Sequence, residues 1–169
     1  MKSSTPGAPE HRNVGQAPSR AGEYPSVHDC EILQFPKVSD HRGNLTFVEE
    51  FRHVPFDVRR VFYVYDIPSG EDRGAHAHRA LHQVIVCLSG GLDVHLDDGV
   101  EKRVVHLNRP WLGLHVRPMI WAAEGNFDPG TVYIVLASDY YDEADYIRDY
   151  STFVEVARVE RRPSESQEP

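Results

Sequence analysis

Short runs of strand-forming residues recur about every ten residues through the middle of this chain, and most of them end at a turn-forming residue. This regular spacing is typical of a β-sandwich or β-barrel rather than of long helices. The clearest turn is Asp97-Asp98-Gly99, a strong hairpin signal between two alternating segments. The runs are 44–50, 60–65, 82–88, 92–96, 103–107, 111–116 and 131–137. We therefore predict an all-β domain with one short C-terminal helical segment, within residues 143–158.

One domain should account for most of the chain. A length of 169 residues with 40% hydrophobic content allows one core but is short for two domains. Residues 1–27 are rich in serine, proline and glycine and have no hydrophobic period, and residues 159–169 form a similarly polar end. We predict that both ends are disordered tails, and that residues 28–158 form the folded domain.

The composition excludes several classes of protein. The chain carries 18 lysine and arginine residues against 26 aspartate and glutamate residues, and it has no basic stripe. Since phosphate contacts dominate nucleic-acid affinity, we do not expect a nucleic-acid partner. No apolar run approaches the ~20 residues of a membrane span, and no apolar leader is visible. The two cysteines, Cys30 and Cys87, form neither a disulfide framework nor a metal motif. We expect a cytoplasmic protein with no membrane partner.

The segment 73–78, with the sequence RGAHAH, is the strongest candidate for chemistry. Alternate residues of a strand point to one face, so His76 and His78 should project together. Two neighbouring imidazoles suit proton transfer near neutral pH or the ligation of a metal. The plainer interpretation is a pair of surface histidines on an edge strand. We favour a functional pair, because the segment follows a glycine and leads into a fully apolar strand, which directs it inward.

A third histidine, His82, leaves a metal site open as an alternative. His82 shares strand parity with His76 and His78, but a straight strand would separate the outer two by ~20 Å at ~3.3 Å per residue. The three could meet only if the chain turned back near residues 79–80, and they could then hold a divalent metal ion. In the other interpretation, His82 faces solvent at the start of the next strand.

Four arginines lie near expected turns, at positions 42, 59, 60 and 73. Guanidinium groups form paired hydrogen bonds with phosphate oxygens, so these residues are candidates for binding a diphosphate. Each of them alone is more often an ordinary surface charge. Arg73 is the strongest candidate, because it lies three residues before His76.

Aromatic side chains offer further candidates. Tyr63 and Tyr65 share one face of an expected strand, so the side to which this face turns decides for both whether they pack or reach a ligand. Trp121 could form the wall of a sugar or base site near the mouth of a barrel, and core packing is an equally good interpretation.

These residues together resemble the sugar 3,4-ketoisomerases of the cupin superfamily. Those enzymes act on dTDP-4-keto-6-deoxyglucose in the synthesis of 3-amino sugars. The resemblance covers roughly residues 29–155, and the pairing of the RGAHAH segment with a later DYYDEADYIR segment makes it specific. The residues that carry it are Arg42-Gly43, 60–63, 73–78, Gln83, 97–99 and 137–150.

The resemblance implies a cupin-type jelly-roll β-barrel that forms a homodimer by exchanging N-terminal strands and needs no metal or other cofactor. It implies that His76 and His78 lie in the sugar pocket, with His78 favoured as the base, and that Tyr63 is an active-site tyrosine. The substrate-binding residues that it implies are Arg73, Arg60, Arg42, Gln83 and Trp121.

Two positions depart from the family pattern. A histidine is expected after Trp121, where this chain has Ala122-Ala123, and His82 replaces a common acidic residue. The first change removes a potential pocket group and the second alters the pocket charge. Neither touches His76 and His78, so the implied reaction class is unchanged.

The implied reaction follows from the acidity of the hydrogen at C3, beside the C4 ketone. A base removes this hydrogen, an enediol forms, and a proton returned to C4 leaves the ketone at C3. Such a site needs a base with a pKa near neutrality, a donor to the enediolate oxygens and the exclusion of water. The alternatives are a metal-dependent cupin enzyme built on His76, His78 and His82, and a non-catalytic module that binds a sugar nucleotide.

Overall fold

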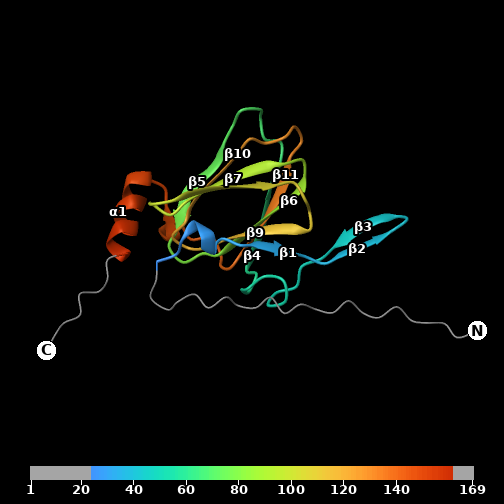
Figure 1. The fold of residues 1–169 in the computed structure, drawn as a ribbon, viewed down its shortest axis with the longest axis horizontal. Helices are drawn as coiled ribbons and strands as arrows, with labels where there is room; N and C mark the ends of the chain where they lie inside the picture. The colour runs from blue at the N-terminus through green and yellow to red at the C-terminus, as the bar shows by residue number, and fades with distance from the viewer. Residues whose placement is uncertain (1–23, 162–169) are drawn as a thin grey trace, which may run out of the picture.

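The structure, a computed structural model, describes residues 24–161 and shows two β-sheets that face each other, with one helix at one end (Figure 1). In chain order the elements are η1 (Val27–Asp29), β1 (Ile32–Gln34), β2 (Lys37–Asp40), β3 (Gly43–Thr46), β4 (Arg60–Val64), β5 (Arg73–His78), β6 (Gln83–Ser89), β7 (Leu92–Asp97), β8 (Lys102–Leu107), β9 (Leu112–Val116), β10 (Trp121–Gly125), β11 (Val132–Ala137), η2 (Glu143–Asp145), β12 (Tyr146–Ile147) and α1 (Tyr150–Glu160).

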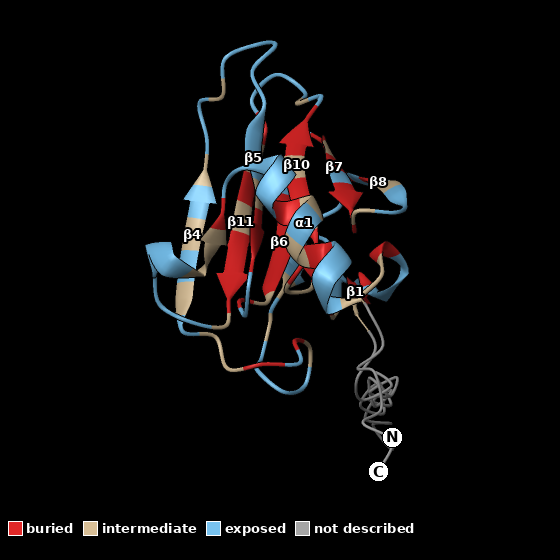
Figure 2. Cartoon of the chain, turned by 90° about the vertical axis from the view of Figure 1, so that its left-hand side faces the viewer, coloured by how far each residue is buried: buried red, intermediate tan, exposed pale blue. Residues whose placement is uncertain are grey.

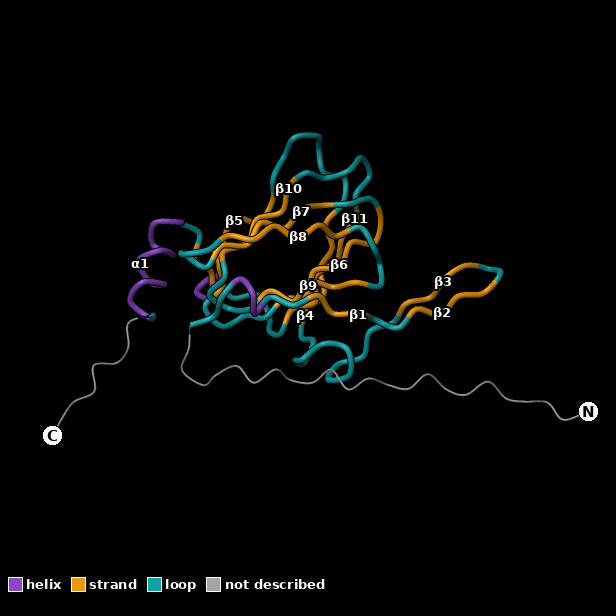
Figure 3. The backbone as a smooth tube through the Cα atoms, viewed as in Figure 1, coloured by secondary structure: helices purple, strands orange, loops and turns teal. Residues whose placement is uncertain are grey.

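The two sheets have the crossed strand order of a jelly roll. One sheet has the order β1-β9-β6-β11-β4 and the other has the order β12-β5-β10-β7-β8. From β4 to β7 and from β8 to β12 consecutive strands alternate between the sheets, whereas β7 and β8 are neighbours in one sheet, and Figure 3 shows the two layers. Among residues 24–161 no ladder joins the two sheets into a closed cylinder. The prediction of an all-β cupin-type jelly roll with a short C-terminal helix is confirmed.

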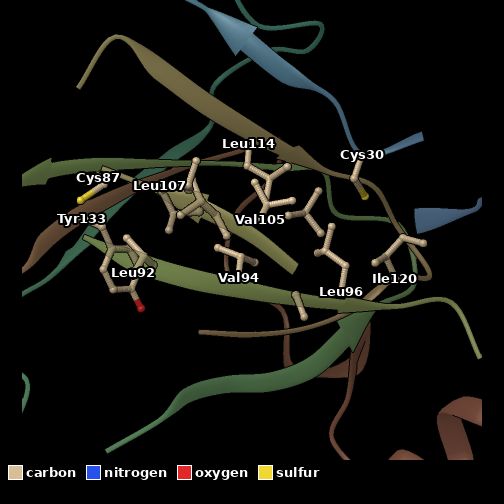
Figure 4. Close-up of a cluster of buried hydrophobic side chains, with 14 of the residues drawn as sticks. Cys30, Cys87, Leu92, Val94, Leu96, Val105, Leu107, Leu114, Ile120 and Tyr133 are labelled. Carbon is tan, nitrogen blue, oxygen red and sulfur yellow. The ribbon is translucent and has the colours of Figure 1, made fainter. Parts of the chain in front are cut away.

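The main core lies between the sheets and follows from the period of two in each strand. Leu92, Val94 and Leu96 of β7 are fully buried and point into the same layer as Leu114 of β9 (Figure 4). Alternate residues of an antiparallel strand face opposite sides, so each sheet buries one face and leaves the other for a second layer. Both cysteines are buried in this layer without a disulfide bond.

Helix α1 lies at one end of the sandwich, where it packs on the outer side of β5 and β10 (Figure 1 and Figure 2). Asp149 caps its N-terminus by accepting a hydrogen bond from the backbone N–H of Thr152. Phe153 and Ala157 of the helix are buried against Ala77 of β5, which points outward between the two histidines. The helix thus packs against the outer face of β5, and the inner face of β5 is directed to the space between the sheets.

A β-hairpin formed by β2 and β3 extends away from the body of the molecule (Figure 1). Its apolar side chains Val38 and Leu45 are 54% and 61% exposed. The strand predicted over 44–50 is therefore shorter and belongs to this arm. The N-terminal strand that the resemblance implies corresponds to β1, which pairs with β9.

The packed part of the chain extends past both ends of the predicted domain. Most of the expected tails lies outside the described residues, but Val27 is fully buried and the Tyr24 hydroxyl donates to the carbonyl of Met119 at 3.1 Å. At the other end α1 continues to Glu160, and Arg161 pairs with Asp98 at 2.8 Å. No helix within residues 24–161 is long and apolar enough to cross a membrane.

Candidate active site

A bulge in β5 sets the direction of the two histidines. Ala122 of β10 pairs with His76 and Ala123 pairs with Gly74, so Ala75 is an extra residue in the ladder. Gly74 and Ala75 both have positive φ angles, of 72° and 56°. Bulges of this kind redirect the side chains that follow them. Beyond the bulge His76 and His78 face the space between the sheets, as the sequence predicts, and their Nε2 atoms lie 3.1 Å apart.

Asp145 holds the second histidine from behind. Its Oδ2 atom lies 2.8 Å from Nδ1 of His78, and its Oδ1 atom accepts a hydrogen bond from the backbone N–H of Ala80 at 2.7 Å. A carboxylate can only accept, so Nδ1 of His78 carries the proton. Nε2 of a neutral His78 is then an acceptor, and it also lies 3.3 Å from the amide nitrogen of Gln83 on β6.

This tautomer determines the state of His76. Because Nε2 of His78 is an acceptor, Nε2 of His76 must donate the proton of the 3.1 Å contact. Nδ1 of His76 is then left with a free lone pair. That atom is buried and makes no hydrogen bond of normal geometry within residues 24–161, although the backbone of Gly74 lies close enough to raise the pKa of the ring. Asp145, His78 and His76 therefore form a chain that ends in an unpartnered base.

Both imidazoles are neutral at physiological pH. Burial is the main cause that lowers the pKa of His78 to about 4, and the charge of His76 adds to it, while Asp145 acts in the opposite direction. Burial also lowers the pKa of His76. A neutral imidazole can accept a proton, so the pair is suited to act as a base.

Tyr146 of β12, which lies within the segment 137–150 that carries the resemblance, packs against both histidines. Its ring lies 4.2 Å from that of His78 and 4.9 Å from that of His76. Arg148 lies over the other side of the phenol ring, 4.3 Å from its centroid. These contacts limit the motion of the imidazoles, because β12 pairs Tyr146 directly with His78.

Arg60 of β4 brings a cation to the same end of the site. Its charge contributes to the lowered pKa of His78, and its guanidinium lies 5.3 Å from the ring of Phe62 and 5.6 Å from that of Tyr141. Its Nε and one terminal nitrogen are buried without a hydrogen-bond partner among the described residues. Buried donors are normally paired, so this guanidinium is arranged to receive an anionic or carbonyl oxygen from a ligand.

Tyr63 and Trp121 are not brought into the site. Arg60 and Phe62 face the interior, so alternation along β4 turns Tyr63 outward, where it is 64% exposed and stacks on Tyr65. Trp121 points to the other face of β10 and packs on Phe153 of helix α1. In one chain Tyr63 therefore lies on the outer surface, and Trp121 packs under helix α1.

Arg42 and Arg73, which the resemblance also implies as substrate-binding residues, lie apart from the histidines. Arg42 is exposed on the β2–β3 arm and forms an ion pair with Asp40 at 2.6 Å. Arg73 is exposed at the start of β5, near enough to Glu124 for its charge to lower the pKa of that residue. Of the predicted substrate-binding residues, the structure therefore places Arg60 and Gln83 beside the histidines within one chain.

His82 belongs to a separate pair on the outside of the first sheet. Its Nδ1 atom lies 3.0 Å from Nε2 of His115, and both rings pack near Phe56. The neighbouring residue Gln83 is the one that points to His78, so His82 faces the opposite side. The three histidines of the metal alternative do not converge. Within residues 24–161 no group of three or more histidine, cysteine or acidic side chains is arranged to hold a metal.

Comparison with known proteins identifies the family. The family model described as "FdtA: WxcM-like, C-terminal" matches residues 28–158. The chain belongs to this family. An FdtA-family relative is TDP-4-oxo-6-deoxy-alpha-D-glucose-3,4-oxoisomerase of Aneurinibacillus thermoaerophilus, 46% identical over 123 residues, which are 73% of this chain and 88% of the relative.

Solved structures of similar FdtA-type proteins share the fold. QdtA, a sugar 3,4-ketoisomerase from Thermoanaerobacterium thermosaccharolyticum solved with TDP, is 36% identical, with a TM-score of 0.77 over 79% of this chain and 98% of QdtA. A histidine-to-asparagine variant of QdtA has been solved with TDP-4-keto-6-deoxyglucose. WlaRB, a TDP-quinovose 3,4-ketoisomerase from Campylobacter jejuni, is 41% identical, with a TM-score of 0.73 over 76% of this chain and 99% of WlaRB.

Proposed function

We propose that this protein is an isomerase that moves the keto group of a TDP-linked 4-keto-6-deoxyhexose from C4 to C3. The observation that carries this function is the chain from Asp145 through His78 to the free Nδ1 atom of His76, in a member of the FdtA family. The relatives named as 3,4-ketoisomerases, one of them 46% identical, support the same reaction. The product belongs to amino-deoxysugar biosynthesis.

The roles of the two histidines follow from their hydrogen bonds. His78 has partners on both ring nitrogens, whereas His76 has one nitrogen free. We therefore assign the removal of the C3 proton to His76, and the sharing of the positive charge that develops on it to His78 and Asp145. This order differs from the sequence expectation, which favoured His78. It keeps both histidines in the catalytic pair.

Arg60 and Gln83 complete the sugar end of the proposed site. The unpartnered guanidinium of Arg60 would bind an oxygen that gains negative charge as the C3 proton leaves. The amide of Gln83 holds Nε2 of His78 and limits rotation of the ring. Arg73, at the other end of β5, is the candidate that we assign to the diphosphate.

The assembly and setting of the enzyme are part of the same proposal. We propose a homodimer in which the β2–β3 arm is exchanged, because Val38 and Leu45 are uncovered in one chain. Such an exchange could carry Arg42 to the neighbouring site. The reaction involves no net oxidation, so we expect it to need neither a nicotinamide nor a metal, and we expect the enzyme to act in the cytoplasm.

The test of this function is incubation of the purified protein with TDP-4-keto-6-deoxyglucose, followed by NMR of the sugar. The expected product carries its ketone at C3. His76→Asn is the matched control, since asparagine keeps a polar, hydrogen-bonding side chain at this position and removes the proposed base. A wild-type protein that binds TDP and leaves the ketone at C4 would support the non-catalytic binding module instead.

A further inference from the structure

Glu124 is a buried acid that the histidine pair does not explain. It lies on β10 and its side chain is 8% exposed. Ala122, two residues earlier on the same strand, belongs to the core between the sheets. Because alternate residues of a strand face the same side, Glu124 also points into the space between the sheets.

The ladder between β10 and β5 places Glu124 diagonally from His76. Ala122 pairs directly with His76, and Glu124 pairs with Arg73. Diagonal neighbours on one face of an antiparallel pair are ~7–8 Å apart at Cα, within reach of long and aromatic side chains. A sugar ring bound against this face of the sheet could therefore contact both side chains.

Two small residues adjoin Glu124 on the face that carries His76. Its Oε2 atom lies only 2.5 Å from the position that a Cβ atom of Gly74 would occupy, so the carboxyl group rests directly against the glycine. Ala122, opposite His76, contributes only a methyl group. A larger side chain at position 74 would displace the carboxyl group.

Within residues 24–161 the carboxyl group has a hydrogen bond from its own backbone N–H and none from another side chain. A buried acid without such a partner costs stability and is commonly retained for a function. Burial raises the pKa of Glu124 to about 7, and the charge of Arg73 opposes this rise. The group can therefore exist as acid and as carboxylate at physiological pH.

The 3,4-isomerisation needs two proton exchanges. One proton moves from C3 to C4, and a second moves from the oxygen on C3 to the oxygen on C4. His76 accounts for the first exchange only. A carboxyl group suits the second exchange, because it can release a proton from one oxygen and accept another on its second oxygen.

We propose that Glu124 carries the proton between the two substrate oxygens while His76 carries the proton between the two carbons. This role rests on the proposed ketoisomerase function. In the first step His76 takes the C3 proton, the electron pair of that C–H bond forms the C3=C4 double bond, and the C4 oxygen takes the proton of Glu124. In the second step the Glu124 carboxylate takes the proton of the C3 oxygen, and His76 returns its proton to C4. The ketone is then at C3 and both side chains have regained their initial states.

The first test is the pH dependence of turnover in wild type, Glu124→Gln and Glu124→Met. Wild-type kcat should fall as the pH rises through about 7, since Glu124 must be protonated to act as a donor. Both variants should lose at least ~10²-fold in kcat with a small change in KM, and the residual activity should lack this alkaline limb. The control is Asp72→Asn, because Asp72 is exposed beside Gly125 and the variant should keep wild-type kcat.

The second test needs no turnover. In a His76→Asn background, infrared difference spectra should show a protonated carboxyl band that shifts when TDP-4-keto-6-deoxyglucose binds and that is absent from the His76→Asn/Glu124→Gln protein. A band that does not respond to the bound sugar would overturn the role of Glu124, as would kcat within threefold of wild type in both single variants. If wild type does not isomerise the sugar, the proposed function fails, and the infrared shift still decides whether Glu124 contacts the ligand.

Discussion

The carboxylate of Asp145 lies 2.8 Å from Nδ1 of His78 and is itself anchored by the backbone N–H of Ala80. The two residues are 67 positions apart in the chain. The contact fixes which ring nitrogen of His78 carries the proton, and through the contact between Nε2 atoms it also fixes the tautomer of His76. The reactivity of His76 therefore depends on a residue that does not touch it.

Replacing Asp145 by asparagine should reverse both tautomers. The asparagine oxygen would still accept from Ala80, so its amide nitrogen would donate to Nδ1 of His78 and move the proton of that ring to Nε2. His76 would then carry its proton on Nδ1 and lose its free lone pair. We expect kcat to fall by at least ~10²-fold with little change in TDP affinity.

The nitrogen-15 shifts of His78 should report the reversed tautomer independently of activity. Asp142→Asn is the control, since Asp142 caps the same turn by accepting from Ala144 and does not contact either histidine. Its kcat should stay near that of wild type. Normal turnover in Asp145→Asn, or an unchanged His78 tautomer, would show that Asp145 does not set the tautomers of the two histidines.

Arg60 should affect function and stability in opposite directions. Its buried, unpartnered guanidinium costs desolvation energy in the free protein. Arg60→Met keeps an unbranched side chain out to the position of Nε and removes the charge, so the thermal midpoint should be unchanged or higher. We expect kcat/KM for TDP-4-keto-6-deoxyglucose to fall at least ~10-fold. Steady-state kinetics and thermal unfolding measure the two effects. Arg59→Met is the comparison, since Arg59 is exposed and pairs with Asp57. A loss of stability in Arg60→Met and not in Arg59→Met would show that Arg60 stabilises the fold and is not held ready for a ligand.

The pair formed by His82 and His115 should make the fold sensitive to acid. Burial is the main cause that lowers the pKa of His115 to about 3, below its ordinary value of ~6.5. Between these values the unfolded chain binds a proton that the folded protein does not, so the free energy of unfolding falls as the pH drops below ~6.5. The contribution from His115 is fully present above that pH.

Denaturant unfolding of wild type and His115→Gln at several pH values isolates this contribution. The stability of wild type relative to the variant should fall by about 2 kcal/mol between pH 7 and pH 5, since each pH unit below ~6.5 costs about 1.4 kcal/mol. A constant difference between wild type and His115→Gln would show that the histidine pair does not titrate as described.

Strand patterning predicted most of the fold because alternation and turns are local. The hairpin at Asp97-Asp98-Gly99 joins β7 and β8 as expected. Strand β10 was missed, since its sequence of one tryptophan, two alanines, a glutamate and a glycine has low strand propensity. It forms because it lies between β5 and β7, whose ladders satisfy its backbone.

The site was less predictable, because its contacts join distant segments. The inward direction of His76 and His78 followed from their parity. Tyr63 was expected in the site from the resemblance alone; in the structure it lies on the outer face of β4, because both faces of this strand carry apolar or aromatic residues and only the partner sheet decides between them. The roles of Asp145 and Glu124 depend on pairing across sheets and on burial, and neither leaves a mark in the local sequence.

The most direct measurement is a time course of wild-type protein and His76→Asn with TDP-4-keto-6-deoxyglucose in deuterium oxide, followed by proton NMR. Wild type should give a 3-keto product, with deuterium at C4 to the extent that the proton on His76 exchanges with solvent before it returns to carbon, and turnover should be at least ~10²-fold lower in His76→Asn. A wild-type protein that produces no 3-keto sugar, or a His76→Asn protein that turns over at the wild-type rate, would contradict it.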